Sequence, residues 1–410
     1  MAAPDLTPND AFDRFNRLQG ANAAPDPYPE WAKKRRETPV WLVPPTEFFE
    51  SGMLMPGSPD QIAVPLSFDA VVEVLRDGET FSSSAYANTM GLVMGHSILE
   101  MDEPEHFKYR GLIQSAFNRR QLDRWENELV RPLIEGCVAE IRSKGRGDLV
   151  RDLTFPFPVR VICGMIGLPE ETHATFHRLA LELIMIAFDP ALGMAASAGL
   201  RELFSGVLAE RRRAPRDDLM SELAMAELDG TRLDDEQIYA FLRLLAPAGA
   251  ETTYRSSSNL LLGLLSDPEQ WEAVRSDPGL IPAAIEEGLR WECPLTGIQR
   301  TAARDAEICG VKIPAGTPVH VCLGAANRDE TRWENPDRFD IHRPRLHHSS
   351  FAFGPHTCLG MHLARMETRI LLETLFEQLP GLRLDPDAEA PHITGRMFRS
   401  PLALPVVFDA

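Results

Sequence analysis

The sequence predicts a mainly α protein with a small β region. The strongest helix signal begins at Asp234, an N-cap residue with Gln237 three positions later, and stops at Ser266-Asp267-Pro268. A second, nearly continuous helical stretch covers residues 121–213. Segments typical of strands are short and few, and lie at residues 40–43, 61–65, 308–313, 317–323 and 404–408.

We expect these elements to form one domain over residues 26–410, preceded by an N-terminal arm of residues 1–25. A short helix is expected in the arm near residues 10–17. Residues 308–313 and 317–323 are predicted to pair as a hairpin that turns at Pro314-Ala315-Gly316. Residues 82–98 mix small polar with apolar residues, which is typical of a loop that covers a ligand.

Charge and cysteine content exclude several classes of function. The formal net charge of −18 argues against a nucleic-acid-binding protein, because binding phosphates requires a basic face. The six cysteines lie far apart, which is typical of free thiols in a reducing compartment. We find no signal peptide and no apolar segment of membrane-spanning length, so a cytoplasmic protein without a membrane anchor is expected.

Cys358 carries the clearest chemical signal. It lies in Phe351-Ala352-Phe353-Gly354-Pro355-His356-Thr357-Cys358-Leu359-Gly360, directly before a helix whose apolar residues recur every three or four positions. Free N–H groups at a helix N-terminus favour anions, so this position predicts a thiolate of lowered pKa that acts as a metal ligand or nucleophile. A buried thiol and a zinc site with His356 and His362 are the alternatives, although no second cysteine pair supports zinc.

The long helix is disrupted near its middle. Inside a helix, proline costs about 3 kcal/mol and glycine about 1 kcal/mol relative to alanine. Pro247 and Gly249 therefore predict a deliberate opening. Beside it lie Glu251 and Thr252, an acid and a hydroxyl suited to proton delivery. The alternative is that Glu251 pairs with Arg255 on an exposed face while Thr252 hydrogen-bonds back to a carbonyl.

Together these segments resemble the cytochromes P-450. The loop matches the family's haem-binding signature at Phe351, Gly354, His356, Cys358 and Gly360, whereas Ala352 stands where the family usually has glycine. The segment Ala248-Gly249-Ala250-Glu251-Thr252 matches the oxygen-activation motif Ala-Gly-x-acid-Thr. The resemblance implies a triangular, α-rich domain with haem b between the long kinked helix and the cysteine loop. Cys358 would be the axial ligand of the haem iron, and Ala248 and Gly249 would lie against the haem.

A pair of cations precedes these motifs in the chain. His106 and Arg110 are four residues apart on one helical face, and spacing alone favours a solvated basic surface. The resemblance implies instead that both bind a haem propionate, together with Arg300.

Glu287 and Arg290 match the family's Glu-x-x-Arg motif. The resemblance implies that Arg338 completes a buried charge network with them. The alternative is a surface pair between Glu286 and Arg290.

By resemblance, the protein is an oxidoreductase of the monooxygenase type. It would insert one oxygen atom from O2 into a hydrophobic small molecule of terpenoid or aromatic type, with Glu251 and Thr252 in the proton route. Electrons would pass from NAD(P)H through a ferredoxin reductase to a ferredoxin, which would dock on a basic patch of Lys108, Arg119, Arg120 and Arg365. A peroxide-dependent haem-thiolate oxygenase and a non-catalytic haem sensor are the alternatives.

The residues expected to line the substrate pocket are apolar, which favours a hydrophobic substrate. They are Tyr86, Met90, Leu92, Ile184, Met185, Leu244, Leu245, Leu295, Ile298, Met397 and Phe398.

Overall fold

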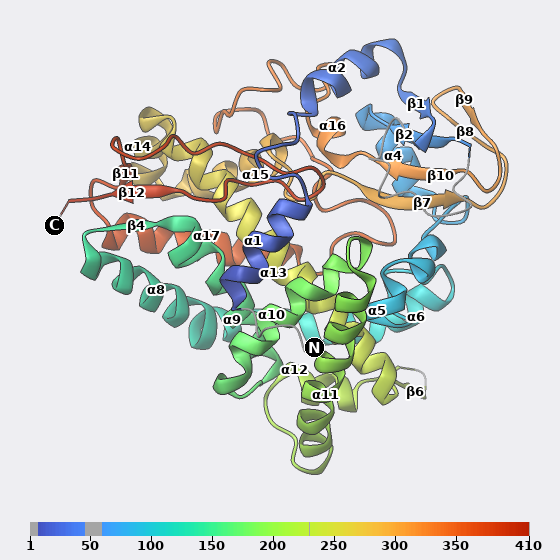
Figure 1. Ribbon diagram of the computed structural model, residues 1–410, viewed down its shortest axis with the longest axis horizontal. Coiled ribbons are helices and arrows are strands. Elements are labelled where there is room, and N and C mark those ends of the chain that lie inside the picture. Colours follow the sequence, from blue (N-terminus) through green and yellow to red (C-terminus); the bar gives the residue numbers. More distant parts are fainter. Residues whose placement is uncertain (1–6, 46–59, 229, 410) are drawn as a thin grey trace.

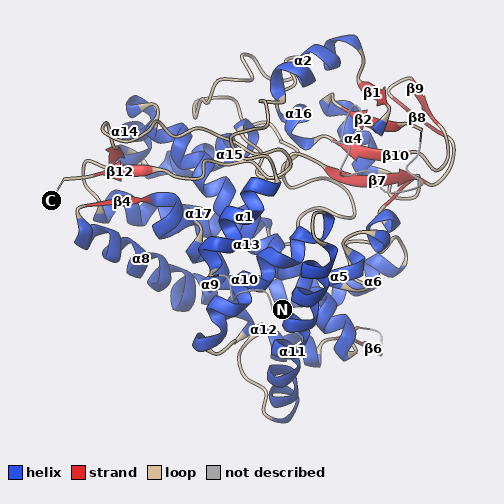
Figure 2. Cartoon of the chain, viewed as in Figure 1, coloured by secondary structure: helices blue, strands red, loops and turns tan. Residues whose placement is uncertain are grey.

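The computed structural model describes residues 7–45, 60–228 and 230–409, so the first six residues of the predicted arm lie outside the described residues. Figure 1 shows a roughly triangular molecule in which most strands gather near one corner. Helices dominate and sheets are small, which confirms the predicted fold class (Figure 2). Within the described ranges, no helix combines the length and the apolar character that a membrane crossing requires.

The helices in chain order are α1 (Pro8–Leu18), α2 (Tyr28–Glu37), α4 (Phe68–Arg76), α5 (Gly91–Met94), α6 (Glu105–Gln114), α7 (Arg119–Trp125), α8 (Arg131–Lys144), α9 (Pro156–Ile166), α10 (His173–Ile184), α11 (Pro190–Arg213), α12 (Leu219–Met225), α13 (Asp235–Leu265), α14 (Pro268–Ser276), α15 (Ile281–Trp291), α16 (Leu323–Asn327) and α17 (Met361–Gln378). The strands are β1 (Val40–Val43), β2 (Ile62–Pro65), β3 (Phe81–Ser82), β4 (Arg146–Asp148), β5 (Glu227–Leu228), β6 (Thr231–Arg232), β7 (Ile298–Ala302), β8 (Ala306–Ile308), β9 (Val311–Ile313), β10 (Pro318–Val321), β11 (Arg383–Leu384) and β12 (Pro405–Val407).

Helix α13 runs through the middle of the molecule (Figure 1). The predicted capping box is present: the Gln237 N–H donates to the Asp234 side chain at 2.8 Å, and the Asp234 N–H donates to Gln237 Oε1 at 2.9 Å. The helix continues through Pro247 to Leu265. It packs against α9, α10, α11, α15 and α17. The long helix is thus the central element of the core.

The main sheet has the order β1-β2-β10-β7-β3, and β10 pairs with β7 in antiparallel fashion. The predicted hairpin between residues 308–313 and 317–323 is wrong. The segment 306–313 is itself the hairpin β8–β9, because Cys309 and Gly310 have φ values of 46° and 84° and form a tight turn. Pro314-Ala315-Gly316 leads the chain back to β7, where the Gly316 N–H donates to the Ala302 carbonyl at 2.7 Å.

The helix expected in the N-terminal arm forms as α1. Its Phe12 and Phe15 are buried in the main core, where the Phe12 ring contacts the Phe155 ring with centroids 4.4 Å apart. Asp13 accepts a hydrogen bond from Arg151, and Arg14 pairs with Asp189 at 2.8 Å. Residues 7–18 therefore pack as part of the main core, while a division of the chain at residue 25 stays a prediction.

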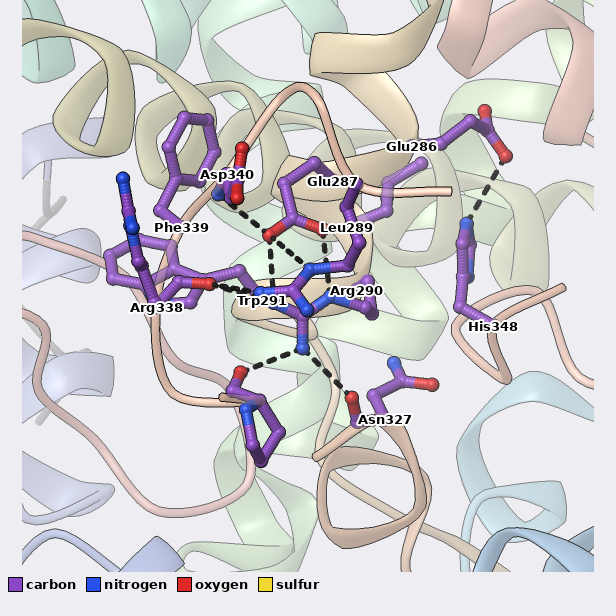
Figure 3. Close-up of polar contacts among 12 residues, drawn as sticks. Glu286, Glu287, Leu289, Arg290, Trp291, Asn327, Arg338, Phe339, Asp340 and His348 are labelled. Carbon is purple, nitrogen blue, oxygen red and sulfur yellow. Dashed lines mark hydrogen bonds and ion pairs between the residues drawn. The ribbon is translucent and has the colours of Figure 1, made fainter. Parts of the chain in front are cut away.

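Glu287 and Arg290 form a buried ion pair with N–O distances of 2.7 and 2.8 Å, shown in Figure 3. The prediction of Arg338 as the third charged partner is wrong. The exposed Arg338 side chain extends away, and only its backbone carbonyl accepts a hydrogen bond from Arg290. The additional cation is Arg343, whose Nε lies 3.4 Å from Glu287. A residue five positions further along the chain thus reaches the carboxylate.

The alternative pair between Glu286 and Arg290 does not form. Glu286 instead pairs with Arg365 of α17 at 2.7 Å and with His348 at 3.3 Å. The half-buried Glu286 and the buried Glu287 thus belong to two separate charge networks on α15.

Glu367 lies buried on α17 at the contact with α13. Burial raises the pKa of its carboxyl to about 8, although a hydrogen bond with Thr253 of α13 offsets part of that effect. Leu363 and Ile370 lie on the same face of α17, four residues before and three after Glu367, so the carboxyl interrupts an apolar stripe.

We expect Glu287→Gln to lower the free energy of unfolding by about 3 kcal/mol or more, because it leaves the buried Arg290 without a carboxylate. The matched control, Glu286→Gln, removes a half-exposed pair and should cost about 1 kcal/mol or less. Urea unfolding of both variants checks this difference. Equal losses would contradict a buried, structure-determining role for Glu287.

The pH dependence of stability should change in Glu367→Gln. Between about pH 4.5 and pH 8 the folded carboxyl keeps its proton while the unfolded one loses it, so stability falls as pH rises through that window. The variant has no such proton, so its free energy of unfolding should rise relative to that of the parent by up to about 1.4 kcal/mol per pH unit. Urea unfolding at pH 5, 6.5 and 8, within that window, measures this gain. The control Glu377→Gln, exposed on the same helix, should show a constant offset.

Candidate functional site

The loop that carries Cys358 closes on itself. The Cys358 N–H donates to the Phe351 carbonyl at 2.8 Å, and the Thr357 N–H donates to the Gly354 carbonyl at 3.1 Å. Gly354 has φ +73°, and a Cβ there would lie 2.2 Å from the carbonyl oxygen of Leu75 at the end of α4. Only glycine satisfies both the backbone angle and the contact.

Ala352 adopts φ 55°, the left-handed region that favours glycine. A side chain in this region costs about 1–2 kcal/mol, which is a physical reason for the glycine that the family usually has at this position. The Ala352 N–H still donates to the Ser349 carbonyl at 2.8 Å, so the loop keeps its turn.

Cys358 has an accessible side chain, yet protein surrounds it closely. Burial raises the pKa of the thiol, and the Gly360 N–H, Arg110 and Arg365 offset only part of that effect. The predicted lowering of the pKa is therefore wrong for the protein alone, because the loss of water raises the pKa of the thiol more than the helix N-terminus lowers it.

Basic side chains surround the loop. His106 is buried and stacks on His356 with ring centroids 4.0 Å apart. Its Nδ1 lies 3.1 Å from Glu103, while its buried Nε2 has no partner among the described residues. Burial lowers the pKa of His356 to about 3, so this ring is neutral. His356 Nε2 lies 3.1 Å from the Ser83 hydroxyl.

Arg110 and Arg300 have no carboxylate within 4.0 Å among the residues that the structure describes. Arg110 donates to the Thr357 carbonyl of the cysteine loop, and Arg300 donates to its neighbour's carbonyl, Gln299, at 2.6 Å. Burial lowers the pKa of both guanidinium groups. Cations taken out of water without a counter-ion indicate an anionic ligand.

Helix α13 has one open face. From Ile238 to Leu265 the described side chains are buried except at Leu244, Ala248, Gly249 and Thr252. Leu244, Ala248 and Thr252 follow one another at four-residue spacing and so share one side of the helix. Small residues at the middle of this face leave room for a bulky group.

Gly249 has a second function. A Cβ at this position would lie 2.7 Å from Ile162 Cδ1, so the missing side chain also lets α9 pack closely against α13.

Glu251 and Thr252 have the contacts foreseen by the alternative interpretation. The Thr252 hydroxyl donates to the Ala248 carbonyl at 2.6 Å, and Glu251 pairs with Arg255 at 3.1 Å. The pair is buried, however, rather than on an exposed face. Burial raises the pKa of the Glu251 carboxyl, and Arg255 offsets part of the effect. Glu251 is therefore a buried acid one residue from the open face.

The structure brings part of the predicted substrate pocket together. Leu295 forms an isolated bridge with Phe398, and the Tyr86 hydroxyl accepts a hydrogen bond from the Gln299 N–H at 2.9 Å. Two of the predicted residues are largely exposed, Leu92 at 58% and Met397 at 44%. Met185 and Leu245 are buried, and the half-buried members are Tyr86, Met90, Ile184, Leu244, Leu295, Ile298 and Phe398.

The residues around Cys358 fit a haem. A flat group with two carboxylates would meet the partnerless His106 Nε2 and the guanidinium groups of Arg110 and Arg300. A coordinated metal ion deprotonates a thiol outright. The iron of a haem would thus supply, beside Cys358, the positive charge that the protein alone does not provide. The open face of α13 offers small residues to such a group.

Two further residues, Glu367 of α17 and Arg343 beside Glu287, were not predicted from the sequence. Glu367 was detectable, because a lone acid interrupts the apolar stripe of α17. The contact of Arg343 with Glu287 depends on a loop whose path no local pattern defines.

Comparisons with known proteins agree with this geometry. The family model described as Cytochrome P450 matches residues 279–397. The cytochrome P450 monooxygenase PikC of Streptomyces venezuelae is 33% identical over 94% of this chain and 92% of its own length. The structure of cytochrome P450 CYP109Q5 from Chondromyces apiculatus superposes with a TM-score of 0.84 at 33% identity, over 94% of this chain and 96% of that one.

A further solved structure, CYP109E1 from Bacillus megaterium in complex with testosterone, has a TM-score of 0.83 at 29% identity and covers 94% of this chain and 100% of that one. Fold, site and relatives lead to one conclusion. The chain belongs to the cytochrome P450 family of haem-dependent monooxygenases, which act on O2.

Proposed function

We propose that the protein inserts one oxygen atom from O2 into a C–H bond of a hydrophobic small molecule, of terpenoid or aromatic type, with electrons delivered by a ferredoxin. NAD(P)H would supply these electrons through a ferredoxin reductase. The observation that carries the proposal is that one region combines Cys358, the unpaired His106 Nε2, two arginines without a carboxylate within 4.0 Å among the described residues, and the open face of α13.

In this proposal Cys358 ligates the iron, while His106, Arg110 and Arg300 bind the propionates. Phe351, Gly354, His356 and Gly360 shape the loop. When bound, the haem supplies the dioxygen chemistry, and a thiolate ligand favours cleavage of the O–O bond. The protein supplies the position, the proton route and the shape of the pocket.

Thr252 is proposed as the group that donates protons to the reacting oxygen. Its hydroxyl donates to the Ala248 carbonyl at 2.6 Å, which places it on the open face. From there the hydroxyl can rotate toward a ligand. Glu251, one residue earlier and buried, is proposed as the acid that resupplies the proton. A raised pKa suits this role, because it favours the protonated form from which an acid donates.

The apolar character of the candidate lining residues supports a hydrophobic substrate. The relative CYP109E1, solved with testosterone, supports a compact polycyclic molecule. A peroxide-dependent oxygenase is less well supported, because peroxide brings both oxygen and protons and would not require Glu251 and Thr252.

The surface proposed for the ferredoxin is smaller than the sequence suggested. Arg365 is engaged by Glu286 at 2.7 Å and lies over the Phe351 ring, so it belongs to the support of the cysteine loop. Lys108, Arg119 and Arg120 are exposed. Among the described residues Arg119 has only a distant charged partner, Asp123 at 3.9 Å. These three cations remain available to an acidic partner.

Replacing Thr252 by alanine should uncouple the reaction. Loss of the proton donor should lower product formed per NADH consumed by roughly 10²-fold, with peroxide released instead. Thr252→Ser keeps the hydroxyl and is the control. Product, NADH and peroxide are quantified together with the substrate-induced spectral shift, which should be unchanged.

Two outcomes would redirect the proposal. Equal coupling in Thr252→Ala and the parent, or faster turnover with peroxide than with ferredoxin, would favour the peroxide-dependent enzyme. NADH consumption that no substrate stimulates, with any ferredoxin, would indicate a haem sensor.

Charge reversal at Arg119 and Arg120 should slow reduction by ferredoxin and flatten its dependence on salt concentration. The matched control is Arg142→Glu, an exposed cation on α8. Stopped-flow reduction at several ionic strengths makes the measurement. Unchanged rates and salt dependence in the Arg119→Glu/Arg120→Glu variant would exclude this surface as the docking site.

A further inference from the structure

Arg255 is fully buried on α13, four residues after Glu251. Its Nε and Nη2 donate to Glu251 Oε2 at 3.3 and 3.1 Å. Nη2 also donates to Asn16 Oδ1 at 3.1 Å, and Nη1 donates to the Ser400 hydroxyl at 3.1 Å and the Phe398 carbonyl at 3.4 Å. The guanidinium is thus held from two sides that are remote from α13 in sequence.

One side is the N-terminal helix α1, which carries Asn16. Asn16 is itself held, because its amide donates to the Phe12 carbonyl at 2.9 Å. Gln19, one residue past α1, accepts a hydrogen bond from the Phe398 N–H at 3.1 Å, and the Phe15 and Phe398 rings pack with centroids 5.8 Å apart. Helix α1 and the turn of residues 394–400 therefore form one wall around Arg255.

The ring of Phe398 is part of this wall and lies 5.6 Å from the Arg255 guanidinium. The aromatic faces of Tyr254 and Phe15 also face that guanidinium, at 4.6 and 5.8 Å. Aromatic faces attract a desolvated cation, so they stabilise the fully buried guanidinium of Arg255.

Glu251 is anchored at one oxygen only. Oε2 accepts from Arg255, whereas Oε1 accepts no hydrogen bond from any described residue. A carboxyl with one fixed and one free oxygen can hold a proton at the free oxygen and turn little when it gives the proton away. The arrangement suits a relay that must stay oriented.

We propose that Asn16 and Ser400 position the Arg255 guanidinium and that Arg255 in turn positions Glu251, which makes the N-terminal helix part of the proton-delivery apparatus. The inference rests on the proposed function, since it takes Glu251 as the relay acid. Asn16, Ser400 and Arg255 are positioning residues, because none of them needs to touch the haem or the substrate.

Other titratable and charged groups of the surrounding elements have their contacts elsewhere. On α1, Asp13 pairs with Arg151 and Arg14 pairs with Asp189. In the turn of residues 394–400, Arg399 pairs with Glu292 and Asp26. The His177 ring of α10 packs on the Phe155 ring, and Glu367 of α17 forms a hydrogen bond with Thr253. Arg255 is therefore the charged side chain that acts directly on Glu251 within the described residues.

The test titrates Glu251 by its infrared carboxyl band, identified by its loss in Glu251→Gln, in the haem-loaded protein. Removing the cation in Arg255→Gln should raise the apparent pKa of Glu251 by about 1 to 3. Arg255→Lys should restore most of the parent value. Asn16→Ala should shift the pKa in the same direction by less, and it keeps the buried pair, so it serves if Arg255→Gln does not fold.

The matched control is Arg14→Ala, which removes a different α1 contact and leaves Arg255 untouched. It should leave the infrared titration unchanged. The pH profile of product formed per NADH should move with the infrared pKa in each variant.

Two results distinguish a failure of this inference from a failure of the proposed function. If Glu251→Gln leaves the pH profile of coupling unchanged, Glu251 is not the relay acid and that part of the proposed function fails with the inference. If Glu251→Gln changes the profile while Asn16→Ala and Arg255→Gln move neither the infrared pKa nor the profile, the positioning inference alone is overturned.

Discussion

The structure depends on burying α13 from all directions but one. A helix of 31 residues can be enclosed this way only if its neighbours come very close. Missing side chains make this possible: Gly249 admits Ile162 of α9, and Gly288 of α15 lies where a Cβ would be 3.0 Å from Leu260. The face left open at Ala248 and Thr252 is then defined by the packing of everything else.

Because α13 is enclosed in this way, burying polar groups on or beside it carries a high desolvation cost. Glu251, Arg255 and Glu367 are all buried on or beside α13, and each is satisfied differently. Arg255 has hydrogen bonds and aromatic faces, Glu367 is stabilised by keeping its proton, and Glu251 shares the charge of Arg255. Around Cys358 the opposite holds, since the cations Arg110 and Arg300 lack carboxylates among the described residues. Satisfied charges support the fold, and unsatisfied ones mark the ligand site.

Local sequence patterns predicted what local physics decides. The capping box at Asp234 and Gln237 depends on residues three positions apart, and it is present. The third partner of Glu287 was not predicted, because Arg338 and Arg343 lie on the same loop and only its tertiary path brings Arg343 inward. The pKa direction at Cys358 failed for a similar reason: desolvation is set by the whole fold, whereas the sequence showed only the helix terminus.

The contact of Gly354 with Leu75 has a consequence for building hybrid proteins. At Gly354 the cysteine loop meets the end of α4 through backbone atoms, so no flexible side chain can absorb a mismatch at that contact. The two segments are almost 280 positions apart in the chain, yet they form one mechanical unit. Recombination between this protein and a relative would therefore preserve the geometry of the Cys358 loop only when residues 68–76 and 351–360 come from the same parent.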